Sequence, residues 1–295
     1  MTASIDTGVQ ELGRQHPEWQ PWLAVVQEVL SETANAKWEA FVPALSDAQE
    51  DRVPLLSGAT LALEMRSLRP WTERLMRAAV RSGAPKMAAL EPATNPSFDI
   101  FILFKAALCH DGHRLQETAI DLGVDTDALQ AVAALLPMPF LHACHRLWAS
   151  SRYESWTEGY CPICGAWPAL VEVRGIERSR YLRCGRCGSA WQVHCLFCPF
   201  CGMTDHEKLV SLIPESDGST RVIEACTRCL GYVKCFTVLQ GSPPAKVMID
   251  DLGSVELDIA ALHEGYKRPE GSGYALHVTM IEKHSSARSF LRWRS

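Results

Sequence analysis

The sequence predicts a protein of the α+β class, in which an all-α N-terminal domain is followed by two tandem four-cysteine metal-binding β modules. The first observation behind this prediction is the distribution of cysteine, because ten of the twelve cysteines fall between Cys161 and Cys235. The second is hydrophobic periodicity, which is helical before about residue 155 and strand-like in the gaps between the cysteines. This change in character predicts a domain boundary near residue 155.

Four regions are therefore expected along the 295 residues. They are a helical domain over 1–155, a first metal module over 156–193, a second metal module over 194–240, and a partly helical C-terminal segment over 241–295. The hydrophobic content of 47% and the charged content of 21% are typical of a globular protein that buries at least one core.

The first half carries the signals of helix starts and stops. Helices are predicted over 16–41, 69–83, 97–112 and 125–151. Pro70 and Gly83 bracket the second stretch in the order expected for a helix start and stop, and Ser97 is the expected cap of the third. Pro137 and Pro139 should kink or split the fourth stretch.

Histidines and cysteines also cluster in this half, at 109–113 and at His142, Cys144 and His145. Neither cluster supplies four ligands at the spacing of a metal site. A free cysteine beside apolar residues usually behaves as a small buried hydrophobe. We therefore predict no functional role for these clusters and no catalytic residues in the helical half.

Four C-x-x-C pairs dominate the second half. They are CPIC (161–164), CGRC (184–187), CPFC (198–201) and CTRC (226–229). Such a pair forms a tight knuckle that places both sulfur atoms on one side, and a glycine after the second cysteine can take a positive φ. Gly165, Gly188 and Gly202 occupy that position in three knuckles, whereas in the fourth Leu230 intervenes before Gly231.

Pairing the knuckles in chain order gives two similar units. Each unit opens with C-P-x-C-G and has two strand-like runs between its knuckles, which predicts a hairpin. Four thiolates from two facing knuckles form the closed tetrahedral set that zinc or a single iron takes. The predicted ligands are Cys161, Cys164, Cys184 and Cys187 for site 1, and Cys198, Cys201, Cys226 and Cys229 for site 2.

Cys195 and Cys235 remain outside this scheme, and their roles stay open. Cys195 together with Cys198 and Cys201 imitates part of an iron–sulfur cluster motif, but that assignment would leave the evenly repeated pairs incomplete. Thioredoxin-type chemistry needs a C-x-x-C that opens a helix after a strand, and that context is missing.

Charge and hydropathy exclude several classes of protein. The net charge is −5, and residues 156–240 carry nine Lys and Arg against eight Asp and Glu, which argues against binding to nucleic acid. The only basic run in that region is 174–186. The apolar stretch 98–109 is too short to span a bilayer, and the first residues lack the pattern of a signal peptide. We expect a cytoplasmic protein with no membrane insertion, whose cysteines are thiols or metal ligands.

The knuckles and the residues after them closely resemble the formate dehydrogenase accessory protein family (FdhE type). The resemblance runs from about Tyr160 to Arg268 and includes all four knuckles, the "DDL…LD" stretch at 250–258 and "EGY" at 264–266. The tail after residue 270 continues beyond the family's usual end. The resemblance implies a cytoplasmic, non-enzymatic maturation protein that is chaperone-like and docks on the immature catalytic subunit of formate dehydrogenase through its metal-stabilised domain.

The family's four-cysteine sites resemble those of rubredoxin, which implies one iron ion in each, with zinc as the alternative. The alternative function is a zinc-ribbon adaptor that binds nucleic acid or a transcription complex. The resemblance also suggests that the knuckles and the segment 250–266 form the docking surface. In the competing interpretation, Asp250, Asp251 and Asp258 only cap helices and face solvent.

Overall fold

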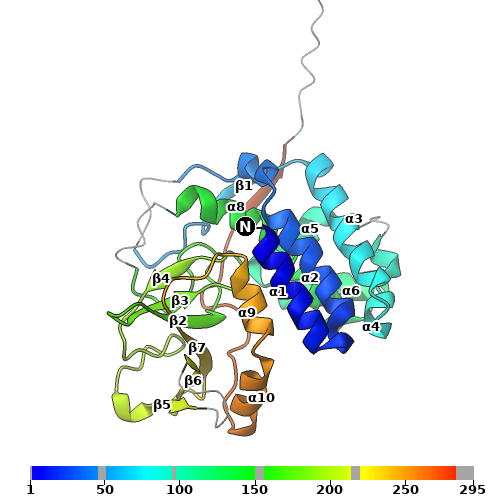
Figure 1. Cartoon of the computed structure of the whole chain (residues 1–295). Coiled ribbons are helices and arrows are strands. Elements are labelled where there is room, and N and C mark those ends of the chain that lie inside the picture. The colour runs from blue at the N-terminus through cyan, green and yellow to red at the C-terminus, as the bar shows by residue number, and fades with distance from the viewer. Residues whose placement is uncertain (1, 46–50, 95–97, 150–155, 214–219, 284–295) are drawn as a thin grey trace, which may run out of the picture.

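The computed structural model describes residues 2–45, 51–94, 98–149, 156–213 and 220–283. Figure 1 shows a group of helices from the first half of the chain beside a sheet from the second half, with two further helices, α9 and α10, next to the sheet. The expected cap Ser97 and the last twelve residues of the tail lie outside the described residues.

The helical half contains eight described α-helices and three short 3-10 helices. The α-helices are α1 (Thr2–Gln15), α2 (Gln20–Thr33), α3 (Met65–Arg81), α4 (Pro85–Ala88), α5 (Ile100–Cys109), α6 (Gly112–Leu122), α7 (Thr126–Ala133) and α8 (Met138–Trp148). The 3-10 helices are η1 (Pro17–Trp19), η2 (Ala36–Phe41) and η3 (Glu91–Thr94). Every stretch predicted to be helical contains a helix, and the fourth is split before Pro137, which is the N-cap of α8.

Several helix boundaries differ from the sequence prediction, and the stretch 16–41 is divided among η1, α2 and η2. Helix α3 begins before Pro70, which is tolerated inside the helix at an exposed position. Residue 112 starts a helix instead of ending one, because His110 ends α5 in a left-handed conformation and the Asp111 side chain accepts a hydrogen bond from the Arg114 N–H at the start of α6.

Large aromatic side chains fill the core of the helical half. Trp38, Trp71, Phe104 and Phe140 are fully buried, and the Trp71 indole donates to the Leu136 carbonyl at 2.9 Å. One helical stretch of the described chain, Thr126–Trp148, is long and apolar enough to cross a membrane, but 78% of its apolar window is buried inside the protein. A core helix passes this test equally well.

The second half forms one six-stranded sheet in the order β4-β3-β2-β7-β6-β5. Its strands are β2 (Leu170–Arg174), β3 (Ser179–Arg183), β4 (Ala190–Gln192), β5 (Leu209–Leu212), β6 (Arg221–Cys226) and β7 (Tyr232–Val238). The short 3-10 helix η5 (His206–Lys208) precedes β5. Both predicted hairpins are present as the antiparallel pairs β2–β3 and β5–β6. The parallel pair β2–β7 joins the two modules into one sheet, with Val171 opposite Cys235.

A small second sheet connects the tail to the helical half. Strand β1 (Thr60–Leu63), in the region predicted to be all-α, pairs in parallel with β8 (Thr279–Glu282). Both strands have four residues, and they are far apart in the sequence, so the local pattern carries little signal for either. The pairing brings the C-terminal segment back across the molecule, as Figure 1 shows.

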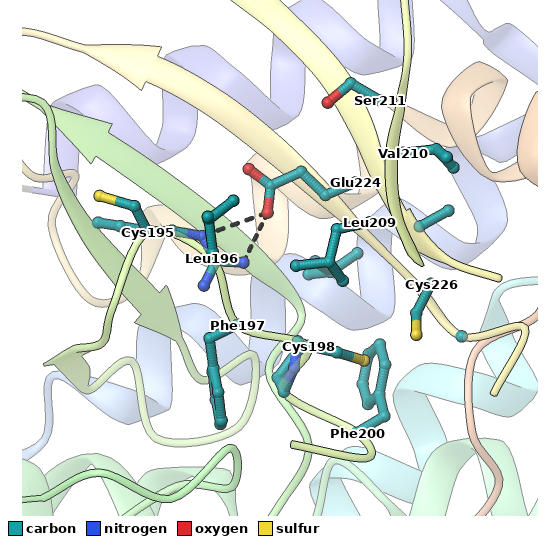
Figure 2. A pocket seen from close by; sticks show the side chains of 15 residues that line it. Cys195, Leu196, Phe197, Cys198, Phe200, Leu209, Val210, Ser211, Glu224 and Cys226 are labelled. Atoms are coloured by element: carbon teal, nitrogen blue, oxygen red, sulfur yellow. Dashed lines mark hydrogen bonds and ion pairs between the residues drawn. The ribbon is translucent and has the colours of Figure 1, made fainter. Parts of the chain in front are cut away.

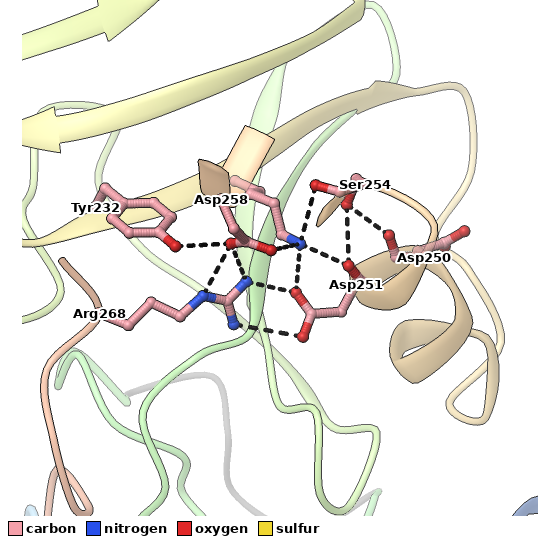
Figure 3. A network of polar contacts seen from close by, with 7 residues as sticks. Tyr232, Asp250, Asp251, Ser254, Asp258 and Arg268 are labelled. Atoms are coloured by element: carbon pink, nitrogen blue, oxygen red, sulfur yellow. Dashed lines mark hydrogen bonds and ion pairs between the residues drawn. The ribbon is translucent and has the colours of Figure 1, made fainter. Parts of the chain in front are cut away.

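A polar network holds α9 (Lys246–Leu252) and α10 (Val255–His263) against the sheet (Figure 3). Lys234 on β7 is fully buried, and its Nζ lies 2.7 Å from Asp251 Oδ1 and 2.8 Å from Asp258 Oδ2. Arg268 binds both aspartates, and the Tyr232 hydroxyl donates to Asp258 Oδ1 at 2.8 Å. Burial alone would raise the pKa of Asp258, but Lys234 and Arg268 lower it.

The network changes the interpretation of the acidic segment. Asp251 and Asp258 neither cap helices nor form an open acidic face, because their carboxylates bind Lys234 and Arg268. Asp250 binds Lys246 and the Ser242 hydroxyl. Through these ion pairs the carboxylates stabilise the fold.

We predict that Asp258→Asn lowers the free energy of unfolding by about 2–3 kcal/mol. This is less than the roughly 3–5 kcal/mol of a fully uncompensated buried charge, because Asp251 still pairs with Lys234. Glu256→Gln, at an exposed position in the first turn of α10, is the matched control and should change stability by less than about 0.5 kcal/mol. Equal urea midpoints for the two variants would contradict the prediction.

Candidate metal centres

The four knuckles share the same two backbone hydrogen bonds. In the first, the carbonyl of Cys161 accepts from the Gly165 N–H, and the Cys161 N–H donates to the Ala166 carbonyl, both at 2.9 Å. The same two bonds, to the residues four and five positions later, recur at Cys184, Cys198 and Cys226 at 2.8–3.0 Å. The repeat recognised in the sequence is therefore a repeat of local geometry.

The residue after the second cysteine is left-handed in all four knuckles. Gly165, Gly188 and Gly202 have φ of 69°, 74° and 69°, and Leu230 adopts 58° in the fourth knuckle. A glycine is needed one position later for a different reason, since a Cβ at Gly231 would come within 2.6 Å of the Phe200 ring. Close packing against the third knuckle thus accounts for the shifted glycine.

The structure brings the eight predicted ligands together as two groups of four, and within each group the sulfur atoms all lie within 4.8 Å of one another. The Sγ–Sγ distances across the facing knuckles are 3.5 Å (Cys161–Cys187) and 3.6 Å (Cys164–Cys184) in site 1. They are 3.7 Å for both pairs, Cys198–Cys229 and Cys201–Cys226, in site 2. A tetrahedral ion with metal–sulfur bonds of about 2.3 Å separates its sulfur ligands by about 3.8 Å, so both groups fit one ion each.

The protonation of the cysteines in site 1 also fits a cation. Burial and the neighbouring cysteines raise the pKa of the Cys161 and Cys187 thiols well above the usual value. Although burial opposes it, hydrogen bonds from the other three cysteines hold the pKa of Cys184 well below that value. Four thiolates buried together need a bound cation to balance their charge.

Site 1 lies at the junction of the sheet and the helices. All four of its cysteines have no exposed surface, and they belong to the same hydrophobic core as side chains of α2, α3, α5 and α8. The hydroxyl oxygen of buried Ser189 lies 3.1 Å from Cys161 Sγ and 3.2 Å from Cys187 Sγ. Ser189 was not predicted as part of the site; the signal in the sequence is its place two residues after the second cysteine, where the other knuckles have Ala166, Met203 and Gly231.

Arg186 connects site 1 to helix α5. Projecting from between Cys184 and Cys187, it donates to the carbonyls of Ala107 (2.7 Å) and Leu108 (3.2 Å), where a cation interacts favourably with the helix C-terminus. The Arg186 Nη1 atom also lies 2.5 Å from His110 Nε2. Because a guanidinium can only donate, this ring nitrogen accepts the hydrogen bond and the imidazole is neutral.

His110, His142 and His145 lie near Cys184 of site 1, whereas His113 is exposed on α6, and none of the four belongs to either group of sulfurs. Burial, and then Arg186, lower the pKa of His110 to about 3, and burial, with His145, lowers that of His142 to about 3. Cys144 is fully buried in the helical core, as expected for a small hydrophobe. Cys109 is partly buried.

Site 2 is more open than site 1. Cys198 and Cys226 are nearly buried, whereas Cys201 and Cys229 are partly exposed. A cavity of about 120 Å³ lies beside the site. Figure 2 shows Glu224 across this cavity from the sulfurs of Cys198 and Cys226, and Arg180, which also lines the cavity, forms an ion pair with Glu224. A larger groove of about 910 Å³ shares Phe197, Pro199 and Phe200 with this cavity and is also lined by Cys201. The aromatic residues that line this groove are Trp156, Tyr160, Trp167, Phe197 and Phe200.

The remaining two cysteines belong to neither group of sulfurs. Cys195 is exposed and lies on the lining of the small cavity, and Cys235 is buried on β7. Burial, and then Glu224, raise the pKa of the Cys235 thiol.

Comparison with known proteins identifies FdhE proteins as relatives, although no protein-family model matches the chain. The chain is 30% identical over 121 residues to the FdhE homolog of Aquifex aeolicus, covering 40% of this chain and 42% of the relative. It is 32% identical over 111 residues to FdhE of Escherichia coli (37% and 35%) and 31% over 121 residues to the homolog of Pseudomonas aeruginosa (39% of each). These matches span less than half the length of the curated relatives.

The fold is similar over a much larger part of the chain. A crystal structure of the FdhE protein from Pseudomonas aeruginosa superposes with a TM-score of 0.58, covering 93% of this chain and 95% of that one at 22% identity. The comparisons confirm the resemblance to FdhE proteins and the mixed helical and sheet architecture expected from the sequence.

We predict that the purified protein binds two metal ions per chain. Cys195→Ser should retain both, because Cys195 is outside both groups of sulfurs, whereas Cys164→Ser and Cys201→Ser should each lose one. Elemental analysis beside native mass spectrometry measures this count. A Cys195→Ser protein that lost an ion would contradict the ligand assignment.

The pH dependence of stability should report the neutral state of His110. Its pKa is about 3 in the folded protein and about 6.5 in an unfolded chain, so its stabilising contribution is complete above pH 6.5 and is lost as the pH falls towards 3. We expect His110→Gln, which keeps an acceptor for Arg186, to reduce the slope of unfolding free energy between pH 6 and 4.5 by about 1.4 kcal/mol per pH unit.

Urea unfolding of metal-saturated protein across this range provides the measurement. Metal release at low pH affects wild type and variant alike, so the difference between their slopes isolates the histidine. His113→Gln, at an exposed position on α6, is the matched control. Equal slopes for wild type and His110→Gln would overturn the assignment.

Proposed function

We propose that this chain is a cytoplasmic accessory protein for the maturation of formate dehydrogenase. In this proposal it docks on the immature catalytic subunit through its metal-stabilised domain and turns over no substrate. The observation that carries the proposal is the pair of closed four-sulfur groups, on a fold that resembles a protein named FdhE over nearly its whole length. Four protein ligands leave no open coordination position for a substrate, which favours a structural or regulatory role for the ions.

Iron is the proposed metal in both sites, as in rubredoxin, with Cys161, Cys164, Cys184 and Cys187 holding one ion. Cys198, Cys201, Cys226 and Cys229 would hold the other. The C-P-x-C-G form of the opening knuckles supports iron, and the sulfur distances accommodate zinc equally well. Oxidised iron protein would be red from thiolate-to-iron charge transfer, and a colourless protein with two zinc ions would establish the alternative.

The surface proposed for docking is the exposed side of the second module. The aspartates of 250–258 form ion pairs with Lys234, Lys246 and Arg268, so a partner that bound them would have to compete with these pairs. The third and fourth knuckles, by contrast, present exposed residues, and the third knuckle borders the aromatic groove. Rigid knuckle loops are suited to presenting side chains to another protein.

A nucleic-acid adaptor is the second candidate, and the basic run 174–186 was its main support. Four arginines of this run are engaged inside the protein. Arg174 and Arg183 bind Glu172, Arg180 binds Glu224, and Arg186 binds the end of α5. Because these four arginines already form ion pairs and hydrogen bonds within the protein, they favour the accessory function over the binding of nucleic-acid phosphates.

We expect deletion of the gene to abolish formate dehydrogenase activity while the enzyme's subunits are still synthesised. Complementation with wild type or Cys195→Ser should restore activity, and Cys164→Ser should not. In a pull-down, the protein should retain the immature catalytic subunit and not the mature enzyme. Normal formate oxidation in the deletion strain would refute the function, and salt-dependent retention of nucleic acid would establish the alternative.

A further inference from the structure

The two groups of cysteines share one knuckle geometry but differ in their access to solvent. In site 1 all four cysteines are fully buried. In site 2 Cys201 and Cys229 are partly exposed. The difference comes from what covers each pair of knuckles.

Other segments of the chain enclose the knuckles of site 1. The backbone N–H groups of 55–56 donate to the carbonyls of Pro162 and Ile163, at 2.8 and 3.1 Å. Gly188 packs so tightly that an added Cβ would come within 2.4 Å of Pro244. A reagent can therefore reach the sulfur atoms of site 1 only after part of the core opens.

The knuckles of site 2 are open on several sides. Apart from Gly202 itself and its two chain neighbours, no heavy atom of the described residues lies within 4 Å of the point where a Cβ of Gly202 would be. Arg228, between the cysteines of the fourth knuckle, is exposed. Cys198 and Cys226 line the small cavity of Figure 2, and Cys201 lines the larger groove. Water and small solutes can approach this site in the folded protein.

Access controls the chemistry of thiolate ligands. Exchange of a metal needs a competing ligand or a proton at the sulfur, and alkylation needs an electrophile there. Site 1 is further protected from ligand exchange and alkylation because the Ser189 hydroxyl lies within hydrogen-bond distance of two of its sulfur atoms. The matching positions of the other knuckles are Ala166, Met203 and Gly231, which have no hydroxyl.

We propose that site 2 is a labile site, which releases and rebinds a divalent metal ion and whose cysteines react with electrophiles, while site 1 retains its ion. This proposal rests on the metal ligation proposed above and is independent of any role in formate dehydrogenase maturation. Site 1 joins the helices to the sheet, and site 2 responds to metal supply and thiol-reactive compounds.

Release of the ion at site 2 also changes the aromatic groove. One wall of this groove is built from the third knuckle itself, since Phe197, Pro199 and Phe200 all line it. The Phe200 ring packs edge-on against Trp167, with 5.4 Å between the ring centroids. When the ion leaves, the knuckle loses the bonds that fix it, and the Phe200–Trp167 contact is released with it.

The test uses the full-length protein loaded with two zinc ions and challenged with an excess of a coloured zinc chelator. We expect two kinetic phases of one ion each, separated by roughly tenfold or more in rate constant because of the difference in access. Native mass spectrometry should show a one-ion intermediate. Iodoacetamide applied to this intermediate should label the cysteines between 198 and 229 and spare those between 161 and 187.

Tryptophan emission reports on the groove in the same experiment. The fast phase should change the emission of wild type, and Trp167→Phe, as the matched control, should release zinc at the same rate without that change. Release of both ions in one phase, or earlier labelling of site 1, would overturn the proposal. A fast phase with unchanged wild-type emission would overturn the coupling to the groove. A protein unable to bind two zinc ions would refute the ligand assignment and this proposal together, whatever a deletion strain showed.

Discussion

Four cysteine sulfur atoms buried at the junction of helices and sheet are the constraint on which much of this structure depends. Water is excluded from site 1, so the charge of its thiolates can be balanced only by a bound cation and nearby donors. A cation there would fix two knuckles at once and with them Arg186, whose guanidinium binds the end of α5. Metal binding would thereby be coupled to folding, because the bound ion fixes the helices and the sheet relative to one another.

Buried ion pairs unite the two cysteine modules in a similar way. Arg180 on β3 reaches Glu224 on β6, across the boundary between the two hairpins. Lys234 on β7 has no exposed surface and holds α9 and α10 through Asp251 and Asp258. Each of these charges would be costly without its partner, so the pairs specify one arrangement of the modules. The net charge of the region is near zero because charges of both signs are present in almost equal number. This net charge alone does not reveal that the charges pair inside the protein.

The sequence was most informative where short-range rules apply. The left-handed glycines of three knuckles, the two hairpins and the split before Pro137 follow from local chemistry, and all are present. Strand β1 could not be predicted, because its partner β8 lies at the other end of the chain. The roles of Arg186 and of Asp258 were equally hidden, since each depends on a contact with a distant segment. The grouping of cysteines needed only spacing, whereas their difference in exposure needed the tertiary fold.

A duplicated motif can therefore hold two sites with different properties. The knuckles repeat the same hydrogen bonds, so the intrinsic geometry offered to a metal is nearly the same in both sites. What differs is the environment. Residues 55–56, Pro244 and Ser189 pack against site 1, and a cavity and a groove adjoin site 2. Because ligand exchange depends on access as well as on bond strength, two sites of equal geometry need not be equal in lifetime. The buried copy is suited to holding the fold together, and the open copy to exchange with the surroundings.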